Sequence, residues 1–287
     1  MDRILGCAVN LSEGRRPDVV KLAAGQAASS AYLLDASCDA DHNRAVITLA
    51  GEPHRLVDGV LRLAGIAVAN IDLRSHSGVH PRLGAVDVVP FYPVLGSLMA
   101  DAVEAARVCG RRLWEELKVP VFLYDQAAAA PETAALPSIR KHAFAGRLPD
   151  FGGDQPHPTA GASVVGARGL LVAYNVDLAT DDGAVARSIA AELRKRYSGG
   201  VRALGFVLPR RGVAQVSMNI VAPDRVTLTE VFQAVSELAA AAGTAPLRSE
   251  IVGLVPRACL DAASRAELAM TEKPKVLEET LERLLAR

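Results

Sequence analysis

Two histidines four residues apart, His76 and His80, are the side chains of this 287-residue sequence best suited to proton-transfer chemistry. Histidine is the side chain whose ordinary pKa lies nearest neutrality, so one imidazole can both accept and donate a proton. Both lie in a loop rich in glycine and proline that leads into residues 85–91, AVDVVPF, a pattern typical of a short buried strand. Because catalytic residues are often carried on loops that a rigid sheet supports, this loop is the first candidate for a functional site.

The residue types in this loop leave three interpretations open. The first is a polar surface loop without chemistry, and the second is a metal site, because two histidines at this spacing on one helix face can bind zinc. Gly78 and Pro81 disfavour a helix, and no HExxH or paired-cysteine motif accompanies the pair, so we expect no metal. The third is a proton-transfer histidine. A metal-dependent alternative would be a hydrolase centre built from His76, His80 and Asp87.

The composition narrows the classes of partner. The sequence has 32 basic and 32 acidic residues, and this balance argues against a nucleic-acid binder, whose affinity depends on a basic surface. Its four cysteines are scattered without a CxxC pair, which is typical of reduced cysteines in a cytoplasmic protein. The sequence shows neither a signal-like N-terminal pattern nor an apolar stretch of membrane length, so we expect a cytoplasmic protein with no membrane partner.

Apolar periodicity predicts alternating strands and helices in the first half of the chain. The expected helices span about 17–30, 53–70 and 97–117, and each follows a segment with the pattern of a strand. The stretch 144–161 breaks this alternation and carries four glycines and three prolines. A long irregular segment inside a compact domain is more often functional than a passive linker.

A second subdomain is expected to begin at about residue 170. Strand and helix patterns there follow the order β-α-β-β-α-β, with the last strand at 249–256 and a helical tail at 258–287. The predicted fold is therefore an α+β protein with two subdomains, residues 1–169 and 170–287. Each is expected to be a mixed sheet with helices packed on it, with the ligand site between them. No internal sequence repeat is evident.

The run 76–91, HSGVHPRLGAVDVVPF, resembles the core motif of the formiminotransferase domain family, which reads close to H-x-G-E-H-P-R-M-G-A-x-D-x-x-P-F. Other segments resemble further motifs of that family, in the same order along the chain. They are residues 10–14 (NLSEG against N-F-S-E-G), 41–46 (DHNRAV against D-H-N-R-S-V), 149–162 (against P-D-F-G-P…G-A) and 166–168 (GAR). The resemblance covers the chain from Cys7 to about Ala263.

The resemblance implies a folate enzyme of histidine degradation, which moves a formimidoyl group from N-formimidoyl-L-glutamate to tetrahydrofolate as co-substrate, with no metal. It implies that His80, the histidine before Pro-Arg, is the catalytic general acid and base. The residues expected to bind the substrate are Asn10, Glu13, Asn43, Arg44, Arg82 and Arg168. The residues expected to hold the folate are Gly152, Gly153, Asp154, Gln155, Pro156, His157, Pro158, Thr159, Ala160 and Gly161. The expected partners are thus a small-molecule substrate and folate, with a homodimer as the expected assembly if the chain associates.

Two departures from the family pattern keep other functions open. Val79 stands where the family usually has a glutamate before the catalytic histidine, and residues 153–160 lack the aromatic side chains that members carry there. The alternatives are a non-catalytic folate-binding or interaction protein of the same fold, or an enzyme that uses another formyl-type donor. Folate is then expected to be held by backbone groups, His157 and nearby arginines.

Overall fold

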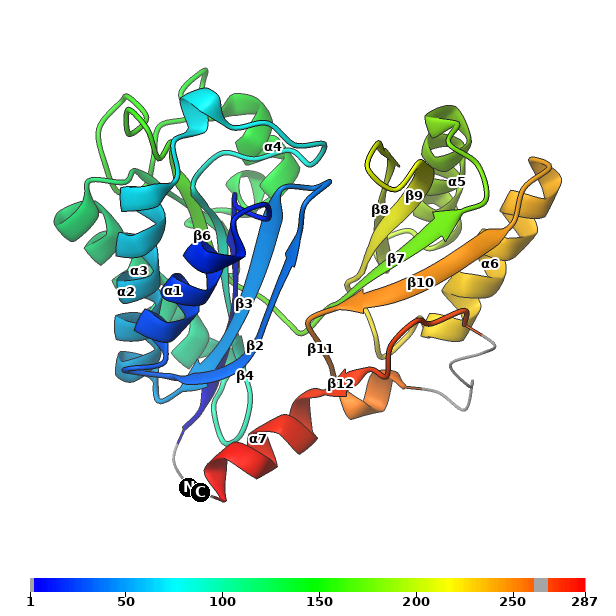
Figure 1. Cartoon of the computed structure of the whole chain (residues 1–287). Helices are drawn as coiled ribbons and strands as arrows, with labels where there is room; N and C mark the ends of the chain where they lie inside the picture. Colours follow the sequence, from blue (N-terminus) through cyan, green and yellow to red (C-terminus); the bar gives the residue numbers. More distant parts are fainter. Residues whose placement is uncertain (1–2, 261–267, 287) are drawn as a thin grey trace. The chain divides into compact units, whose positions relative to one another are not determined.

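The computed structural model describes residues 3–260 and 268–286 and divides into two compact units, residues 1–169 (unit 1) and 170–287 (unit 2). Each unit has its own sheet and its own hydrophobic core, and helices pack on each sheet (Figure 1). The predicted α+β class is confirmed.

Unit 1 is built on a six-stranded mixed sheet with the strand order β2-β3-β1-β4-β6-β5. The strands β1 to β4 are paired antiparallel, whereas β4, β6 and β5 run parallel. Its elements are β1 (Leu5–Leu11), α1 (Pro17–Ala27), β2 (Tyr32–Asp39), β3 (Arg44–Gly51), α2 (Pro53–Asn70), β4 (Val86–Pro93), α3 (Met99–Leu117), β5 (Val121–Asp125), α4 (Leu136–His142) and β6 (Ser163–Ala167).

The two faces of this sheet differ because side chains alternate along each strand. On β1, the residues Cys7, Val9 and Leu11 enter the main core, which α1, α2 and α3 cover (Figure 1). The residue between them, Asn10, therefore lies on the opposite face. A second cluster, which contains Ile139 of α4, packs on that opposite face at the β4-β6-β5 side. Polar side chains near the start of β4 are thus outside the main core.

The helices of unit 1 form where the sequence predicts them. Both α1 and α2 begin with a proline, at Pro17 and Pro53, where the missing N–H costs nothing because the first helical turn has no partner for it. The buried residues of α2 recur at helical spacing, as in Leu56, Val60 and Leu63, and they face the sheet.

Unit 2 has the predicted order β-α-β-β-α-β, and all its main strand pairs are antiparallel, in the order β10-β7-β9-β8. The elements are β7 (Val172–Leu178), α5 (Gly183–Arg196), β8 (Val201–Leu208), β9 (Val213–Ile220), α6 (Leu228–Ala241) and β10 (Pro246–Val252). In unit 1, the strands β1 to β4 with α1 and α2 follow the same order in sequence and the same order in the sheet. The two units therefore share a topology, although no internal sequence repeat is evident.

The C-terminal part of the chain differs from the prediction of one strand and a helical tail. The strand expected at 249–256 is interrupted at Gly253, which has a φ of 82°, so that β10 is followed by a separate β11 (Leu254–Val255). β11 pairs in parallel with β12 (Lys275–Val276), and only then does α7 (Leu277–Leu285) begin. The Glu/Arg spacing of the tail is a local pattern and predicts a longer helix. It carries no information about the pairing of β11 with β12, which joins two segments distant in sequence. Residues 261–267 lie outside the described part.

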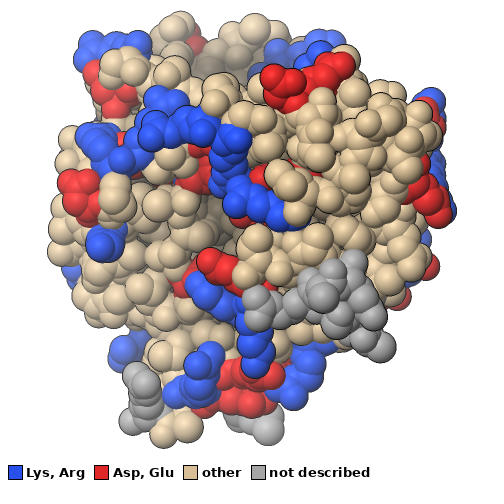
Figure 2. Space-filling model, turned by 45° about the vertical axis from the view of Figure 1, so that its right-hand side comes forward, with Lys and Arg blue, Asp and Glu red and all other residues tan. Residues whose placement is uncertain are grey.

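Charged side chains of both signs are mixed over the face drawn in Figure 2, and the basic ones gather into a row at the upper left of the view. The net charge of zero therefore conceals local clustering. Within residues 3–260 and 268–286, every helix is too short or too polar to cross a membrane.

Candidate active site

Asp87, at the start of β4, is placed by an irregularity in the sheet. Leu11 of β1 pairs with Val86, but the next residue back, Asn10, pairs with Val88, so Asp87 is the extra residue of a β-bulge. Regular alternation from Phe91 through Val89 would direct Asp87 into the main core. The bulge instead turns its carboxylate toward the polar face of the sheet, where it is fully buried.

The buried carboxylate of Asp87 accepts three hydrogen bonds and forms an ion pair with a further guanidinium group. Its Oδ1 accepts from the backbone N–H groups of Leu83 (2.6 Å) and Gly84 (3.3 Å). Its Oδ2 forms an ion pair with Nη1 of Arg44 (2.9 Å) and accepts from Arg140 of α4 (2.7 Å). Although burial raises the pKa of Asp87, the two guanidinium groups outweigh it, and the pKa is lowered. Asp87 is therefore ionised and saturated.

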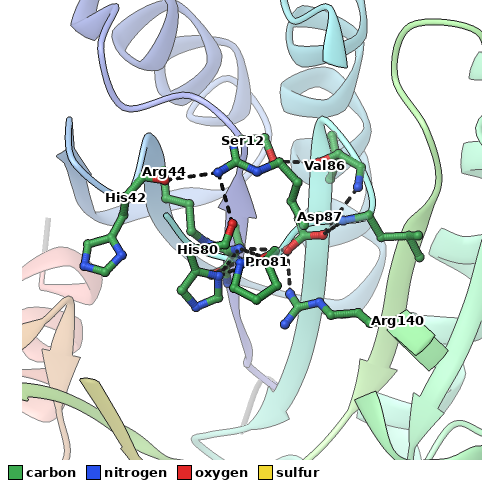
Figure 3. Close-up of polar contacts among 12 residues, drawn as sticks. Ser12, His42, Arg44, His80, Pro81, Val86, Asp87 and Arg140 are labelled. Atoms are coloured by element: carbon green, nitrogen blue, oxygen red, sulfur yellow. Dashed lines mark hydrogen bonds and ion pairs between the residues drawn. The ribbon is translucent and has the colours of Figure 1, made fainter. Parts of the chain in front are cut away.

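His80 lies beside this ion cluster (Figure 3). Its Nδ1 is 2.9 Å from Nη1 of Arg44 and 2.8 Å from the backbone carbonyl oxygen of Pro81. The same Nη1 donates to the carbonyl of Pro81 (3.0 Å), while Nη2 of Arg44 donates to Oδ1 of Asn10 (2.9 Å). One side of the imidazole is thus held by a strand residue, Arg44, and by its own loop.

Both histidines of the loop are neutral at physiological pH. Burial, reinforced by the charge of Arg44, lowers the pKa of His80 to about 3. Burial and the charge of Arg82 lower the pKa of His76 to about 4. A neutral imidazole can accept a proton, and once protonated beside arginines it becomes a strong acid.

A second group of cations lies on the other side of the loop. Arg82 contacts both ring nitrogens of His76 and donates to the carbonyl oxygens of His42 (3.3 Å) and His80 (3.0 Å). Arg15 donates to the carbonyl of Ala40 (3.1 Å) and lies 3.5 Å from Oγ of Ser77. Among the residues that the structure describes, no carboxylate forms an ion pair with either arginine, so this surface favours an anion.

Asn43 connects the segments that surround the site. It has a left-handed φ of 48°, a conformation that asparagine tolerates better than most residues. Its Oδ1 accepts from the N–H of Gly14 (2.9 Å), and its Nδ2 donates to the carbonyl of Ser77 (2.9 Å). Ser12 adds a bond from its hydroxyl to the carbonyl of Gly84 (2.7 Å). The predicted residues Asn10, Asn43, Arg44 and Arg82 are therefore brought together around His80.

Two predicted substrate residues are placed differently. Glu13 is buried and its carboxylate accepts from the backbone N–H groups of Arg15 and Arg16 and from Nε of Arg16 (2.6 Å), which ties down the turn before α1. Arg168 follows β6, and its N–H binds the carbonyl of Phe91 (3.0 Å). Because Phe91 is four residues beyond Asp87, Arg168 lies about 13 Å along β4 from the ion cluster. Within unit 1 it does not share the site of His80.

The predicted folate segment has two parts. Residues 152–156 are exposed, whereas residues 157–161 form a tight turn in which Nδ1 of His157 accepts from the N–H of Ala160 (3.0 Å). This turn is bonded to both ends of the loop that carries His80: the carbonyl of Thr159 accepts from Leu73 (2.8 Å), and that of Ala160 from Ala85 (2.9 Å). The structure thus brings the predicted folate segment and the predicted catalytic loop together.

Sequence reasoning missed three residues of this site. Arg140 reaches Asp87 from α4, 53 positions away, and no local pattern indicates that contact. His42, which is buried, has its ring centroid 6.0 Å from that of His80. Its place directly before the Asn43-Arg44 motif could have indicated it. Arg15 follows the NLSEG segment, and its basic charge was the available signal.

In residues 3–260 and 268–286, no three histidine, cysteine, aspartate or glutamate side chains form a group that could hold a metal ion. The chemistry of the donor set explains this for the candidate loop. Asp87 has its oxygens filled by three N–H donors and the ion pair with Arg44, and Nδ1 of His80 faces a guanidinium group. A metal cation would have to displace these donors and approach positive charge.

Comparison with known proteins supports the resemblance to the formiminotransferase domain family. The model of the formiminotransferase domain, N-terminal subdomain, matches residues 4–168, and the formiminotransferase domain model matches residues 173–284. A protein of Streptococcus pyogenes serotype M1 named glutamate formimidoyltransferase is 38% identical over 279 residues, which cover 92% of this chain and 93% of that protein. A protein of the same name from Thermoplasma acidophilum is 35% identical and covers 98% of both chains.

A longer relative matches through part of its length. The formimidoyltransferase-cyclodeaminase of Rattus norvegicus is 38% identical over 300 residues, which cover 97% of this chain but 55% of that protein. This chain therefore spans about half of that relative. Both family models match in order and together cover nearly all of the sequence, so this protein belongs to the formiminotransferase domain family of enzymes.

Proposed function

We propose that this enzyme transfers the formimidoyl group of N-formimidoyl-L-glutamate to N5 of tetrahydrofolate, with His80 as general acid and base, in the cytoplasmic breakdown of histidine. The names of the relatives that match over nearly their whole length support formimidoyl transfer from glutamate. The folate acceptor and the role of His80 are inferred from the site.

The reaction needs one proton removed and one supplied. N5 of tetrahydrofolate attacks the formimidoyl carbon, a carbon–nitrogen bond forms, and a tetrahedral intermediate results. A base takes the proton from N5, and an acid protonates the glutamate nitrogen as its bond to the carbon breaks. A single imidazole can do both in succession, and such catalysis typically contributes about 10²–10⁴-fold. No metal or redox group is required.

The electrostatics of His80 suit this sequence of events. Because burial and Arg44 lower its pKa to about 3, the ring is neutral and able to accept the N5 proton. The resulting imidazolium lies beside Arg44, so it gives its proton up readily to the leaving nitrogen. The carboxylates of the bound substrate would offset part of the arginine charge, and we therefore expect the pKa of His80 to be higher in the substrate complex than in the free enzyme.

The observation that carries this proposal is the bonding between the folate segment and the catalytic loop. The turn 157–161 binds the loop at Leu73 and at Ala85, on both sides of His80. A pterin held along residues 152–161 would thus be presented to a loop whose ends are fixed by the same segment. Reacting groups held in this way avoid much of the entropy cost of a bimolecular reaction.

The cations of the second group suit the donor. Guanidinium groups bind carboxylates through two parallel hydrogen bonds, and Arg82 and Arg15 have no carboxylate partner among the described residues. We assign the carboxylates of N-formimidoyl-L-glutamate to these two arginines. Arg44 is instead committed to Asp87 and Asn10.

The test is a turnover assay of the purified protein with N-formimidoyl-L-glutamate and tetrahydrofolate, followed through the absorbance of the folate. We expect turnover that requires both compounds, with N-formyl-L-glutamate as the competing donor in a parallel assay. Turnover with the formyl donor alone would replace the proposed substrate. Tetrahydrofolate binding in calorimetry without turnover of either donor would leave a non-catalytic folate-binding protein.

A further inference from the structure

We propose that Asp87 is a positioning residue that sets the tautomer of His80, by drawing an N–H of Arg44 to itself so that Nδ1 of His80 carries the proton and Nε2 the lone pair. The catalytic meaning of this inference rests on the proposed function. The tautomer itself is a property of the resting protein and can be measured without turnover.

The bulge in β4 shows that the placement of Asp87 is specific. Without the extra residue, the carboxylate would enter the main core beside Val89 and Phe91, where an unpaired charge is strongly disfavoured. With it, Asp87 lies between Arg44 of β3 and Arg140 of α4. Bulges recur next to active sites because they redirect a side chain.

The hydrogen atoms around Arg44 can be counted. Its Nη1 has two N–H groups but three acceptors within reach. The carbonyl of Pro81 at 3.0 Å and Nδ1 of His80 at 2.9 Å are at hydrogen-bond geometry, and Oδ2 of Asp87 forms an ion pair at 2.9 Å. A charged oxygen is the strongest of these acceptors. If Asp87 and Pro81 take the two N–H groups, none remains for Nδ1.

The position of the Pro81 carbonyl then decides which ring nitrogen of His80 carries the proton. Its carbonyl oxygen is 2.8 Å from Nδ1, and a carbonyl oxygen accepts but cannot donate. A hydrogen bond at this distance therefore needs the proton on Nδ1. In the neutral ring the lone pair is then on Nε2, which is the nitrogen that would take the proton from N5 of tetrahydrofolate.

Arg140 keeps the carboxylate of Asp87 in the required state. Its Nη2 donates to the same Oδ2 at 2.7 Å, and its charge, after that of Arg44, helps to lower the pKa of Asp87. The carboxylate has no proton to offer and no remaining acceptor position, because Leu83 and Gly84 occupy Oδ1. Asp87 thus acts through Arg44 and not on the substrate.

Replacing Asp87 by asparagine changes one charge and almost no volume. The N–H groups of Leu83 and Gly84 would retain the amide oxygen, so the amide NH₂ would face Arg44 and Arg140, donor against donor. Nη1 of Arg44 would then donate to Nδ1 of His80. The proton of the neutral ring would move to Nε2, and the ring would lose its lone pair on the side of the substrate.

The test is nitrogen NMR of protein labelled with ¹⁵N-histidine at neutral pH, with the His80 signals assigned by their loss in His80→Gln. We expect the proton of His80 on Nδ1 in the natural protein and on Nε2 in Asp87→Asn. The control is Asp101→Asn, which removes a carboxylate that binds Arg3 and the N–H of Leu98, away from the ion cluster. It should leave the tautomer and the turnover unchanged.

Kinetics supply the second readout. We expect Asp87→Asn to lower kcat by about 100-fold or more with little change in KM, because a wrong tautomer affects the chemical step and not the binding of substrate. A structural defect alone would instead lower the fraction of active protein and leave the tautomer of the folded fraction unchanged.

The natural protein decides the question even if Asp87→Asn does not fold. A neutral His80 with its proton on Nε2 in the natural protein would overturn the inference, as would an unchanged tautomer in a folded Asp87→Asn. The outcome is separate from the proposed function. Turnover with the Nε2 tautomer would sink the inference alone, whereas the Nδ1 tautomer without turnover would sink the proposed function alone.

Discussion

At the scale of single residues, the site consists of one imidazole among cations. Arg44 and Arg140 are balanced by Asp87, whereas Arg15 and Arg82 have no carboxylate partner among the described residues. Removing His80 should therefore leave the anion-binding groups in place while removing the group that moves the proton.

We predict that His80→Ala lowers turnover by about 100-fold or more while tetrahydrofolate still binds. His76→Ala should cost less, because His76 contacts Arg82 and not the ion cluster around Asp87. Steady-state kinetics and calorimetry on both variants are the measurements. An equal or larger loss in His76→Ala would transfer the catalytic role to His76.

The histidines also predict how stability depends on pH. Their folded pKa values, about 3 for His80 and about 4 for His76, lie below the ordinary 6.5. As the pH falls below 6.5, the unfolded chain binds protons that the folded chain does not, so stability is lost. We expect the urea concentration at the midpoint of unfolding to decrease as the pH is lowered from about 7 to about 5.

His80→Gln is the variant for this prediction, because it removes one of the titrating groups. The fall in the midpoint over the same pH interval should be smaller than in the natural protein. His54→Gln is the control, since His54 is exposed on α2 and pairs with Glu52 at 3.7 Å, away from the ion cluster. An identical fall in His80→Gln would mean that folding does not lower the pKa of His80.

At the scale of elements, the turn 157–161 and the catalytic loop form one hydrogen-bonded assembly. Gly84 and Gly161 face each other in an isolated bridge, and each lacks room for a side chain. A Cβ on Gly161 would overlap the carbonyl oxygen of Leu83, and the φ of Gly161 is 68°. Glycine is therefore required at this contact by both space and backbone angle.

We predict that Gly161→Ala lowers the free energy of unfolding by about 1–3 kcal/mol. We also expect lower turnover in the folded variant, because the loop around His80 loses its support. Gly153→Ala is the matched control within the same predicted folate segment. A Cβ there meets nothing within 4 Å, and its φ is not left-handed. Chemical denaturation and kinetics on the two variants are the measurements, and equal effects would show that the contact with Leu83 is unimportant.

At the scale of the whole molecule, two units of one topology carry similar buried ion clusters. In unit 2, Asp177 is buried on β7, where it accepts from Gln215 (2.7 Å) and from Arg248 (2.7 Å). The alternate residues of β7, Tyr174 and Val176, enter the core under α5 and α6, so Asp177 lies on the opposite face of the sheet. Each unit thus combines an apolar face that holds helices with a polar face that holds a paired aspartate.

The neutral overall charge and the cationic site together predict a salt effect. Raising ionic strength should raise the KM for N-formimidoyl-L-glutamate with little change in kcat, because salt screens the attraction between the exposed Arg15, the half-buried Arg82 and the substrate carboxylates. Arg82→Gln should weaken this dependence. Lys21→Gln, an exposed change on α1, should preserve it. A KM independent of salt would remove these arginines from substrate binding.

The sequence by itself determined the family and the α+β class, and it selected the loop that we propose to be catalytic. These follow from local patterns: the HPRLGAVDVVPF run, apolar periodicity along α2, and prolines at the starts of α1 and α2. Asn10, Asn43 and Arg44 could be selected in the same way, since each belongs to a short motif that adjoins a strand end. Local spacing suffices where neighbours in sequence are also neighbours in space.

Only the tertiary structure decided which groups surround His80. The bulge at Asp87 depends on the register between β1 and β4, and its partner Arg140 comes from a helix 53 positions away. The parallel register between β4 and β6 places Arg168 next to Phe91, away from the ion cluster, although its motif suggested the site. Strand register depends on pairing between distant segments, and a shift of one residue reverses the face of every side chain, so a single sequence does not reveal it.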